Sequence, residues 1–125
     1  MKKIFISVAM NGREEYEIHD DIVNLKFLGK AYFGNDIEFV DNRDFERIFP
    51  EGINERVWCL GEAIKKLAAC DAMISFDNEL TNRAKGCQIE REVCYNYGIP
   101  VLRIEDWCFR NRVKNTEEVP VCEGC

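Results

Sequence analysis

The chain has 125 residues, of which 46% are hydrophobic and 32% are charged, and its formal net charge is −6. This length suits one compact domain, and no apolar run approaches the roughly 18 residues that span a bilayer. The negative charge argues against a general nucleic-acid binder, which needs a basic surface to displace phosphate counterions, whereas a small anion could still bind in a local cationic pocket.

The first residues, MKKIFISVAM, resemble an export signal only superficially. Their apolar stretch is about eight residues long and lacks a small-residue cleavage pattern, so we interpret it as a buried strand. The seven cysteines are dispersed rather than gathered in a dense framework. We therefore expect a reducing, cytoplasmic setting, in which cysteines in apolar contexts such as Cys70 and Cys94 act as small hydrophobic residues.

The first half of the chain alternates strand and helix patterns. Residues 3–10 are almost wholly apolar and rich in β-branched side chains, which predicts a strand buried on both faces. Helical spacing covers residues 14–32, and residues 37–40 form a second short strand. Residues 41–53 are polar, contain Pro and Gly and have no period. They predict a loop of about 13 residues, a length that is uncommon unless the loop is functional, for example as a lid.

The second half repeats the alternation. The patterns predict an amphipathic helix over 54–69, a strand over 71–76, a polar loop over 77–85, a helix over 86–97 and a strand over 101–104. Residues 105–125 have no clear period, and we expect a less regular C-terminal tail there.

Strands that alternate with helices predict an α/β fold. We expect a single-domain three-layer sandwich over residues 1–125, flavodoxin-like or Rossmann-like, with a small parallel sheet of four to five strands and helices on both faces. In such sheets ligands bind beyond the carboxyl ends of the strands, at the point where the strand order reverses. This rule brings together the loop 11–13, the loop 77–85 and the start of the helix 86–97.

Glu90 lies near the start of that last helix, four residues after Gly86. If it lies in the first turn, the helix dipole stabilises it by roughly some tenths of a kcal/mol for structural reasons alone. A capping box would need Ser or Thr at position 87, which is Cys87, so capping explains Glu90 poorly. A catalytic carboxylate and a structural one both remain open.

Lys85 and Gly86 precede Glu90 and could form an anion site, because a cation, a helix dipole and unpaired N–H groups meet there. The alternative is that Lys85 is a solvated loop lysine.

Asn11, Gly12 and Arg13 follow the first strand at the predicted crevice. Gly12 would let the backbone approach a ligand, and Arg13 could hold a phosphate in bidentate fashion. The structural alternative is a turn in which Arg13 pairs with the adjacent Glu14 or Glu15.

Three polar residues bracket the third strand. Asp77 and Asn78 follow its carboxyl end, where they could hydrogen-bond a ribose or a base, or serve as ordinary loop residues. Asp71 starts the strand at the opposite end, and we expect it to be structural and bonded to nearby backbone amides.

The remaining reactive residues favour no other chemistry. His19 is the only histidine and lies among carboxylates, as on a solvated helix face. Cys87 is at a helix start, which favours a thiolate, but it has no base partner. Cys122 and Cys125 have the spacing of half a zinc site without a second pair, so no metal is predicted, and a frayed tail or a pairing between subunits is the default.

The run DAMISF, its following loop and the segment KGCQIEREVCYNYGIPVL resemble the nucleoside 2-deoxyribosyltransferase-like superfamily. Small phage and bacterial members of that superfamily have a first strand similar to KIFISVAMNGR. The order of elements matches over residues 1–104, and residues 71–102 carry the specific part of the match. The resemblance implies that Glu90 is a nucleophile, which attacks the anomeric carbon of a nucleoside or nucleotide and forms a glycosyl ester.

The same resemblance implies a homodimer or higher homo-oligomer, with no cofactor and no metal. Ala84 stands where the transferases keep an acidic residue, which favours nucleotide N-glycosidase chemistry over base exchange. We expect hydrolysis or transfer at the N-glycosidic bond of a nucleoside monophosphate or related nucleotide. The alternatives are a non-catalytic binder of a nucleotide-derived ligand and a TIR-like NAD glycohydrolase. The substrate-binding residues expected under the leading hypothesis are Asn11, Gly12, Arg13, Asp77, Asn78, Lys85 and Gly86.

Overall fold

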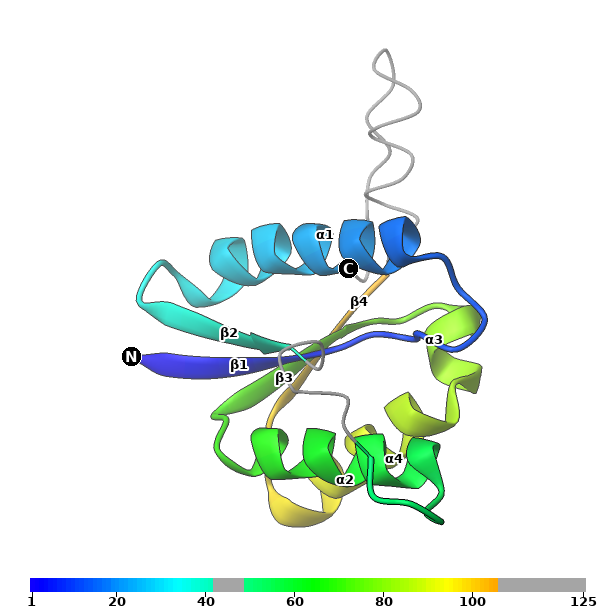
Figure 1. Ribbon diagram of the computed structural model, residues 1–125. Coiled ribbons are helices and arrows are strands. Elements are labelled where there is room, and N and C mark those ends of the chain that lie inside the picture. Colours follow the sequence, from blue (N-terminus) through cyan, green and yellow to red (C-terminus); the bar gives the residue numbers. More distant parts are fainter. Residues whose placement is uncertain (42–48, 106–125) are drawn as a thin grey trace.

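A computed structural model describes residues 1–41 and 49–105 of the chain. The elements are β1 (Lys2–Ser7), α1 (Glu15–Phe33), β2 (Ile37–Asp41), α2 (Glu55–Ala68), β3 (Ala72–Phe76), α3 (Glu79–Arg83), α4 (Lys85–Tyr97) and β4 (Val101–Ile104). The four strands are all parallel and have the order β2-β1-β3-β4. Helix α1 covers one face of the sheet, and α2 and α4 cover the other (Figure 1). This is the predicted α/β three-layer sandwich.

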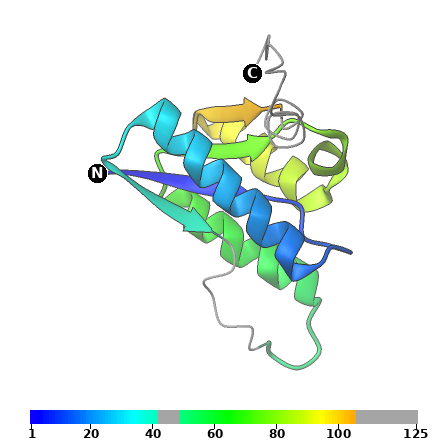
Figure 2. The same ribbon diagram turned by 90° about the horizontal axis from the view of Figure 1, so that it is seen from above.

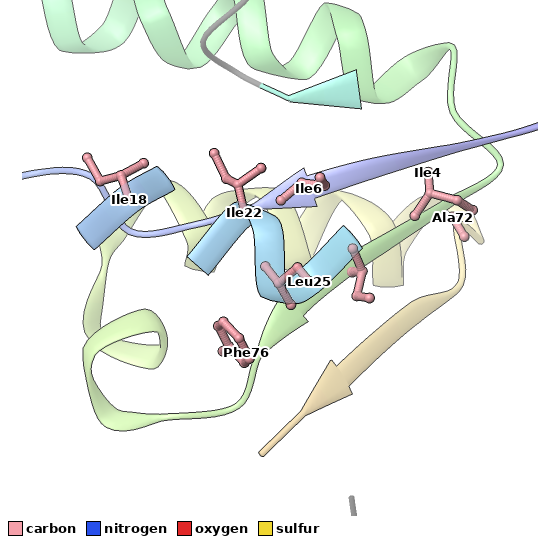
Figure 3. Close-up of a cluster of buried hydrophobic side chains, with 8 residues drawn as sticks. Ile4, Ile6, Ile18, Ile22, Leu25, Ala72 and Phe76 are labelled. Carbon is pink, nitrogen blue, oxygen red and sulfur yellow. The ribbon is translucent and has the colours of Figure 1, made fainter. Parts of the chain in front are cut away.

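Two hydrophobic clusters hold the layers together, because successive strand residues point to opposite faces of the sheet. The cluster against α1 is shown in Figure 3 and consists of Ile4, Ile6, Ile18, Ile22, Leu25, Ala72, Ile74 and Phe76. The cluster against α2 and α4 consists of Phe5, Ala63, Leu67, Cys70, Met73 and Cys94. Strands β1 and β3 contribute to both clusters, which explains why their sequences are almost continuously apolar.

Several predicted boundaries need correction. β1 ends at Ser7 rather than at residue 10, and the predicted loop 77–85 contains the short helix α3. Helix α4 begins at Lys85, one residue before the predicted start. Of the predicted loop 41–53, residues 42–48 lie outside the described residues, as does all of the tail from residue 106 with Cys122 and Cys125.

Asp71 has the structural role expected of it. Its carboxylate accepts a hydrogen bond from the backbone N–H of Lys3 at 2.8 Å, and its own N–H donates to the carbonyl of Lys3 at 2.7 Å. These bonds join the amino-terminal ends of β1 and β3, away from the crevice. Of the helices that the structure describes, none is long and apolar enough to cross a membrane.

Candidate functional site

The strand order reverses at β1, because β2 lies on one side of it and β3 on the other. In parallel sheets the crevice at such a point receives ligands. A buried serine lies near the carboxyl end of each central strand, Ser7 in β1 and Ser75 in β3. The two serines are register partners and are 1% and 0% exposed. They share the face of the sheet that α2 and α4 cover, since they alternate in step with Phe5 and Met73.

Glu90 of α4 lies directly against the first of these serines. Ser7 Oγ donates a hydrogen bond to Glu90 Oε1 at 2.7 Å, and Glu90 is 5% exposed. Burial raises the pKa of Glu90 to about 7, and the hydrogen bond from Ser7 partly opposes that rise. The carboxyl group therefore changes its charge near neutral pH, which is the range in which a proton-transferring or nucleophilic carboxylate is most useful.

Glu90 does not lie in the first turn of its helix, where the helix dipole would have stabilised it. The helix begins at Lys85 after an N-cap at Ala84, whose side chain makes no capping bond, and its first turn has no acidic residue. Glu90 thus lies in the second turn, where the influence of the helix dipole has largely faded. Neither capping nor the dipole explains this residue, and its contact with Ser7 is a tertiary one.

Cys87 belongs to the same cluster, one turn before Glu90. It is 2% exposed. Burial, above all, raises the pKa of the Cys87 thiol to about 11, the hydroxyl of Ser7 has a lowering effect on that pKa, and the nearby charge of Glu90 adds to the rise. A helix start favours an ionised thiolate, but Cys87 is a protonated thiol at neutral pH. The loss of solvation on burial outweighs the stabilisation that the helix start gives to the charged form.

Arg91 follows Glu90 and is held by the second serine. Its Nη2 donates to Ser75 Oγ at 3.1 Å and to the carbonyl oxygen of Phe76 at 2.7 Å, while Nη1 donates to Asn82 Oδ1. Arg91 is 6% exposed, and burial lowers its pKa. Strand β1 thus binds Glu90 through Ser7, and the neighbouring strand β3 binds Arg91 through Ser75 and Phe76.

Sequence reasoning missed four members of this cluster: Ser7, Ser75, Asn82 and Arg91. One signal was available, since each serine interrupts an otherwise apolar strand near its carboxyl end. No local pattern pointed to Arg91, because its acceptors belong to β3 and α3 and are brought to it only by the fold.

Arg13 has a different partner from either of those considered from sequence. Its Nη1 donates to Asp21 Oδ2 at 2.8 Å and to the carbonyl oxygen of Ala9 at 2.9 Å. The side chain of Arg13 is 8% exposed, so the pair is sheltered, and the proposed pairing with the neighbouring residues 14 or 15 is corrected to Asp21. This ion pair fixes the segment between β1 and α1.

Asn11 and Gly12 are the exposed part of that segment. Gly12 has a φ of 75°, a left-handed conformation that favours glycine, and a Cβ added there would meet nothing within 4 Å. Asn11 Oδ1 accepts a long hydrogen bond from Arg56 Nη2 of α2 at 3.4 Å.

The residues after β3 are engaged locally. Asp77 Oδ1 accepts from Asn82 Nδ2 and from Arg103 Nη2, each at 2.9 Å, and the bond from Asn82 is the main cause that lowers the pKa of Asp77. Asn78 Oδ1 accepts from the N–H of Thr81 at 2.8 Å and caps α3. Both side chains thus help to shape the carboxyl edge of β3.

Lys85 and Gly86 form the exposed start of α4, and a Cβ at Gly86 would meet nothing within 4 Å. His19 is exposed on α1, as expected of a residue on a solvated face.

Within residues 1–41 and 49–105, no group of three or more His, Cys, Asp or Glu side chains is placed to hold a metal ion. Comparison of the chain with protein-family models, with curated proteins and with solved structures found no match.

Proposed function

We propose that the protein breaks or transfers the N-glycosidic bond of a nucleoside monophosphate or related nucleotide, with Glu90 as the catalytic carboxylate. The observation that supports this most is a buried carboxyl group with a pKa of about 7 beside the strand-order reversal. The resemblance of residues 71–102 to the nucleoside 2-deoxyribosyltransferase-like superfamily supplies the reaction. A cytoplasmic, homo-oligomeric enzyme is part of the same proposal.

In the proposed reaction, the ionised carboxylate of Glu90 attacks the anomeric carbon as the bond from that carbon to the base nitrogen breaks. The base leaves with the bonding electron pair and takes up a proton from solvent. Water then hydrolyses the glycosyl ester and restores the carboxylate, or a second base displaces it in a transfer reaction. Ser7 holds Oε1 by its hydrogen bond and thereby fixes the orientation of the carboxylate.

Glu90→Gln is expected to reduce base release by on the order of a thousandfold or more, because the amide keeps the size of the side chain but is a poor nucleophile. Chromatography of free base after incubation with nucleoside monophosphates, deoxynucleotides and NAD measures this. Glu92→Gln, an exposed change on the same helix, is the matched control and should retain full activity.

Binding of these nucleotides without base release by the wild type would contradict the enzyme and support the non-catalytic binder. That alternative is favoured by one feature of the site: Glu90 is only 5% exposed, so it is little accessible without movement of its surroundings. Cleavage of NAD alone would support the TIR-like alternative instead.

Lys85 is the more accessible of the two cations proposed to bind phosphate, because Arg13 is sheltered and paired with Asp21. Lys85→Gln should raise KM for a nucleoside monophosphate by roughly tenfold, the loss of one charge-assisted contact, and leave KM for the parent nucleoside unchanged. Steady-state kinetics on the matched pair of substrates tests this. An equal rise for both substrates would show that Lys85 does not contact the phosphate.

A further inference from the structure

The carboxyl ends of β3 and β4 carry a charged cluster that the proposed mechanism does not use. We call it the β4 cluster, and it consists of Asp77, Asn82, Arg91 and Arg103. Arg103 is the register partner of Ser75, so its side chain lies on the face of the sheet that α2 and α4 cover. Figure 2 shows the arrowheads of both strands pointing toward the end of the molecule at which α3 lies. Ligands of parallel sheets bind beyond this end of the strands.

Two guanidinium groups of the β4 cluster converge on one amide oxygen. Asn82 Oδ1 accepts a hydrogen bond from Arg91 Nη1 and another from Arg103 Nη2, the second at 3.2 Å. The other acceptors of Arg91, Ser75 Oγ and the carbonyl oxygen of Phe76, are uncharged. Burial lowers the pKa of Arg91, and the neighbouring charge of Arg103 lowers it further. A buried cation thus has a second cation beside it.

One carboxylate offsets these two cations. Asp77 Oδ1 accepts hydrogen bonds from Arg103 Nη2 and from Asn82 Nδ2, each at 2.9 Å. In the part of the chain that the structure describes, no other acid forms a salt bridge with Arg91 or Arg103. The β4 cluster therefore has two positive charges and one negative charge. Like charges held side by side cost stability, which is characteristic of a functional site, and a bound anion would balance the excess.

The β4 cluster is open to solvent and has unused hydrogen-bonding groups. The side chains of Arg103 and Asp77 are 37% and 36% exposed. Toward the described residues, Nη1 and Nε of Arg103 donate no hydrogen bond, and Asp77 Oδ2 accepts none. Arg91 Nε is buried without a hydrogen-bond partner among them. A ligand that completes the cluster must therefore offer a negative oxygen to Arg103 and a hydrogen to Asp77.

We propose that the β4 cluster binds a phosphate group that still carries a proton, as the free ion or as a monoester. A charged oxygen of the phosphate accepts a hydrogen bond from Arg103 Nη1, and the positive charge of Arg91 stabilises it. The P–OH group donates a hydrogen bond to Asp77 Oδ2. A singly charged phosphate also balances the charge of the cluster.

Sulfate is the informative competitor, because it has the shape of phosphate but carries no proton near neutral pH. Its oxygens would face the carboxylate of Asp77 without a hydrogen bond, so like charges would meet and binding should be weaker. The β4 cluster contains neither Lys85 nor Glu90. The proposal therefore does not depend on the proposed function, and it is tested by binding rather than by release of a base.

Isothermal titration calorimetry of the full chain tests the proposal at about pH 6, where a large share of phosphate groups retains a proton. We expect inorganic phosphate to bind at least tenfold more tightly than sulfate. Asp77→Asn should remove this preference, because the amide no longer repels the doubly charged ion. Ribose 5-phosphate in a parallel titration identifies the natural form: a monoester is indicated if it binds more tightly than inorganic phosphate, and the free ion if it binds less tightly.

Arg103→Gln should raise the dissociation constant for phosphate by roughly tenfold or more, the loss of a charge-assisted contact, with circular dichroism as the check that the variant is folded. Arg83→Gln is the matched control, since Arg83 is an exposed arginine of α3 outside the β4 cluster. It should bind phosphate as the wild type does. Lys85→Gln should keep the preference for phosphate over sulfate.

Three results would overturn the proposal. The first is a wild type that binds no phosphate or binds sulfate equally well. The second is binding that is unchanged in Arg103→Gln. The third is a preference for phosphate that is lost in Lys85→Gln and kept in Arg103→Gln, which would place the ion at the start of α4 instead.

Discussion

Replacement of Glu90 by Gln is expected to stabilise the protein by about 3 kcal/mol above pH 7, and to change its stability little near pH 4. The folded-state pKa of Glu90 is about 7, against an ordinary value of 4.5. Between these values the folded chain holds a proton that the unfolded chain has lost. The free energy of unfolding therefore falls as pH rises through this window, and the fall is complete above the folded-state pKa.

Glutamine retains an oxygen that can accept the hydrogen bond from Ser7, and it never ionises. The comparison between wild type and variant isolates Glu90 from all other titrating groups. Urea unfolding of both proteins, at several pH values between about 4 and 8, provides the measurement. Glu92→Gln serves as the exposed control and should follow the wild type throughout. If the free energy of unfolding depends on pH in the same way for Glu90→Gln and wild type, the charged carboxylate of Glu90 does not destabilise the folded protein.

A native carboxyl that costs stability at neutral pH is characteristic of a functional group, since an uncharged side chain would serve the core better. This cost is the same under each of the functions proposed for the site. The stability experiment tests whether Glu90 is a destabilising charge, and the base-release experiment tests the reaction. Either one can therefore fail without the other.

The fold could be predicted from sequence because its signals are local and repeated. Apolar runs around Ile4 and Ile74, separated by helical spacing, suffice for a parallel sheet. Right-handed connections place the reversal of strand order at β1 only because α1 and α2 cover opposite faces of the sheet. The exception is α3, whose five residues are too few to show a helical period.

The site could be predicted only in part. Topology correctly brought α4 to the crevice, but its start was placed one residue late because Ala84 carries none of the usual N-cap signals. The spacing of residues in the sequence could not predict three contacts of the site. These join Glu90 to Ser7, Arg91 to Ser75, and Arg13 to Asp21. They depend on the packing of α4 and α1 against the sheet, which hydrophobic patterning constrains only coarsely.

Arg91→Met is expected to destabilise the protein by about 2–3 kcal/mol, because it leaves buried acceptors without their donor while filling a similar volume. The guanidinium joins α4 to the end of β3 through Ser75 and the Phe76 carbonyl, and to α3 through Asn82. Arg91→Lys should recover only a minor part of the loss, since one ammonium group cannot reproduce the planar fork that reaches three acceptors.

Arg83→Met is the matched control for Arg91, because the Arg83 side chain is 78% exposed and its ion pair with Glu79 should be worth at most about 0.5 kcal/mol. Urea unfolding at several pH values between about 4 and 8 compares the three variants with wild type. If Arg91→Met is as stable as Arg83→Met, the buried guanidinium does not anchor α4. If it anchors α4 as we infer, Arg91→Met should also weaken the pH dependence that Glu90 confers, because Glu90 is held against Ser7 only while α4 keeps its place on the sheet.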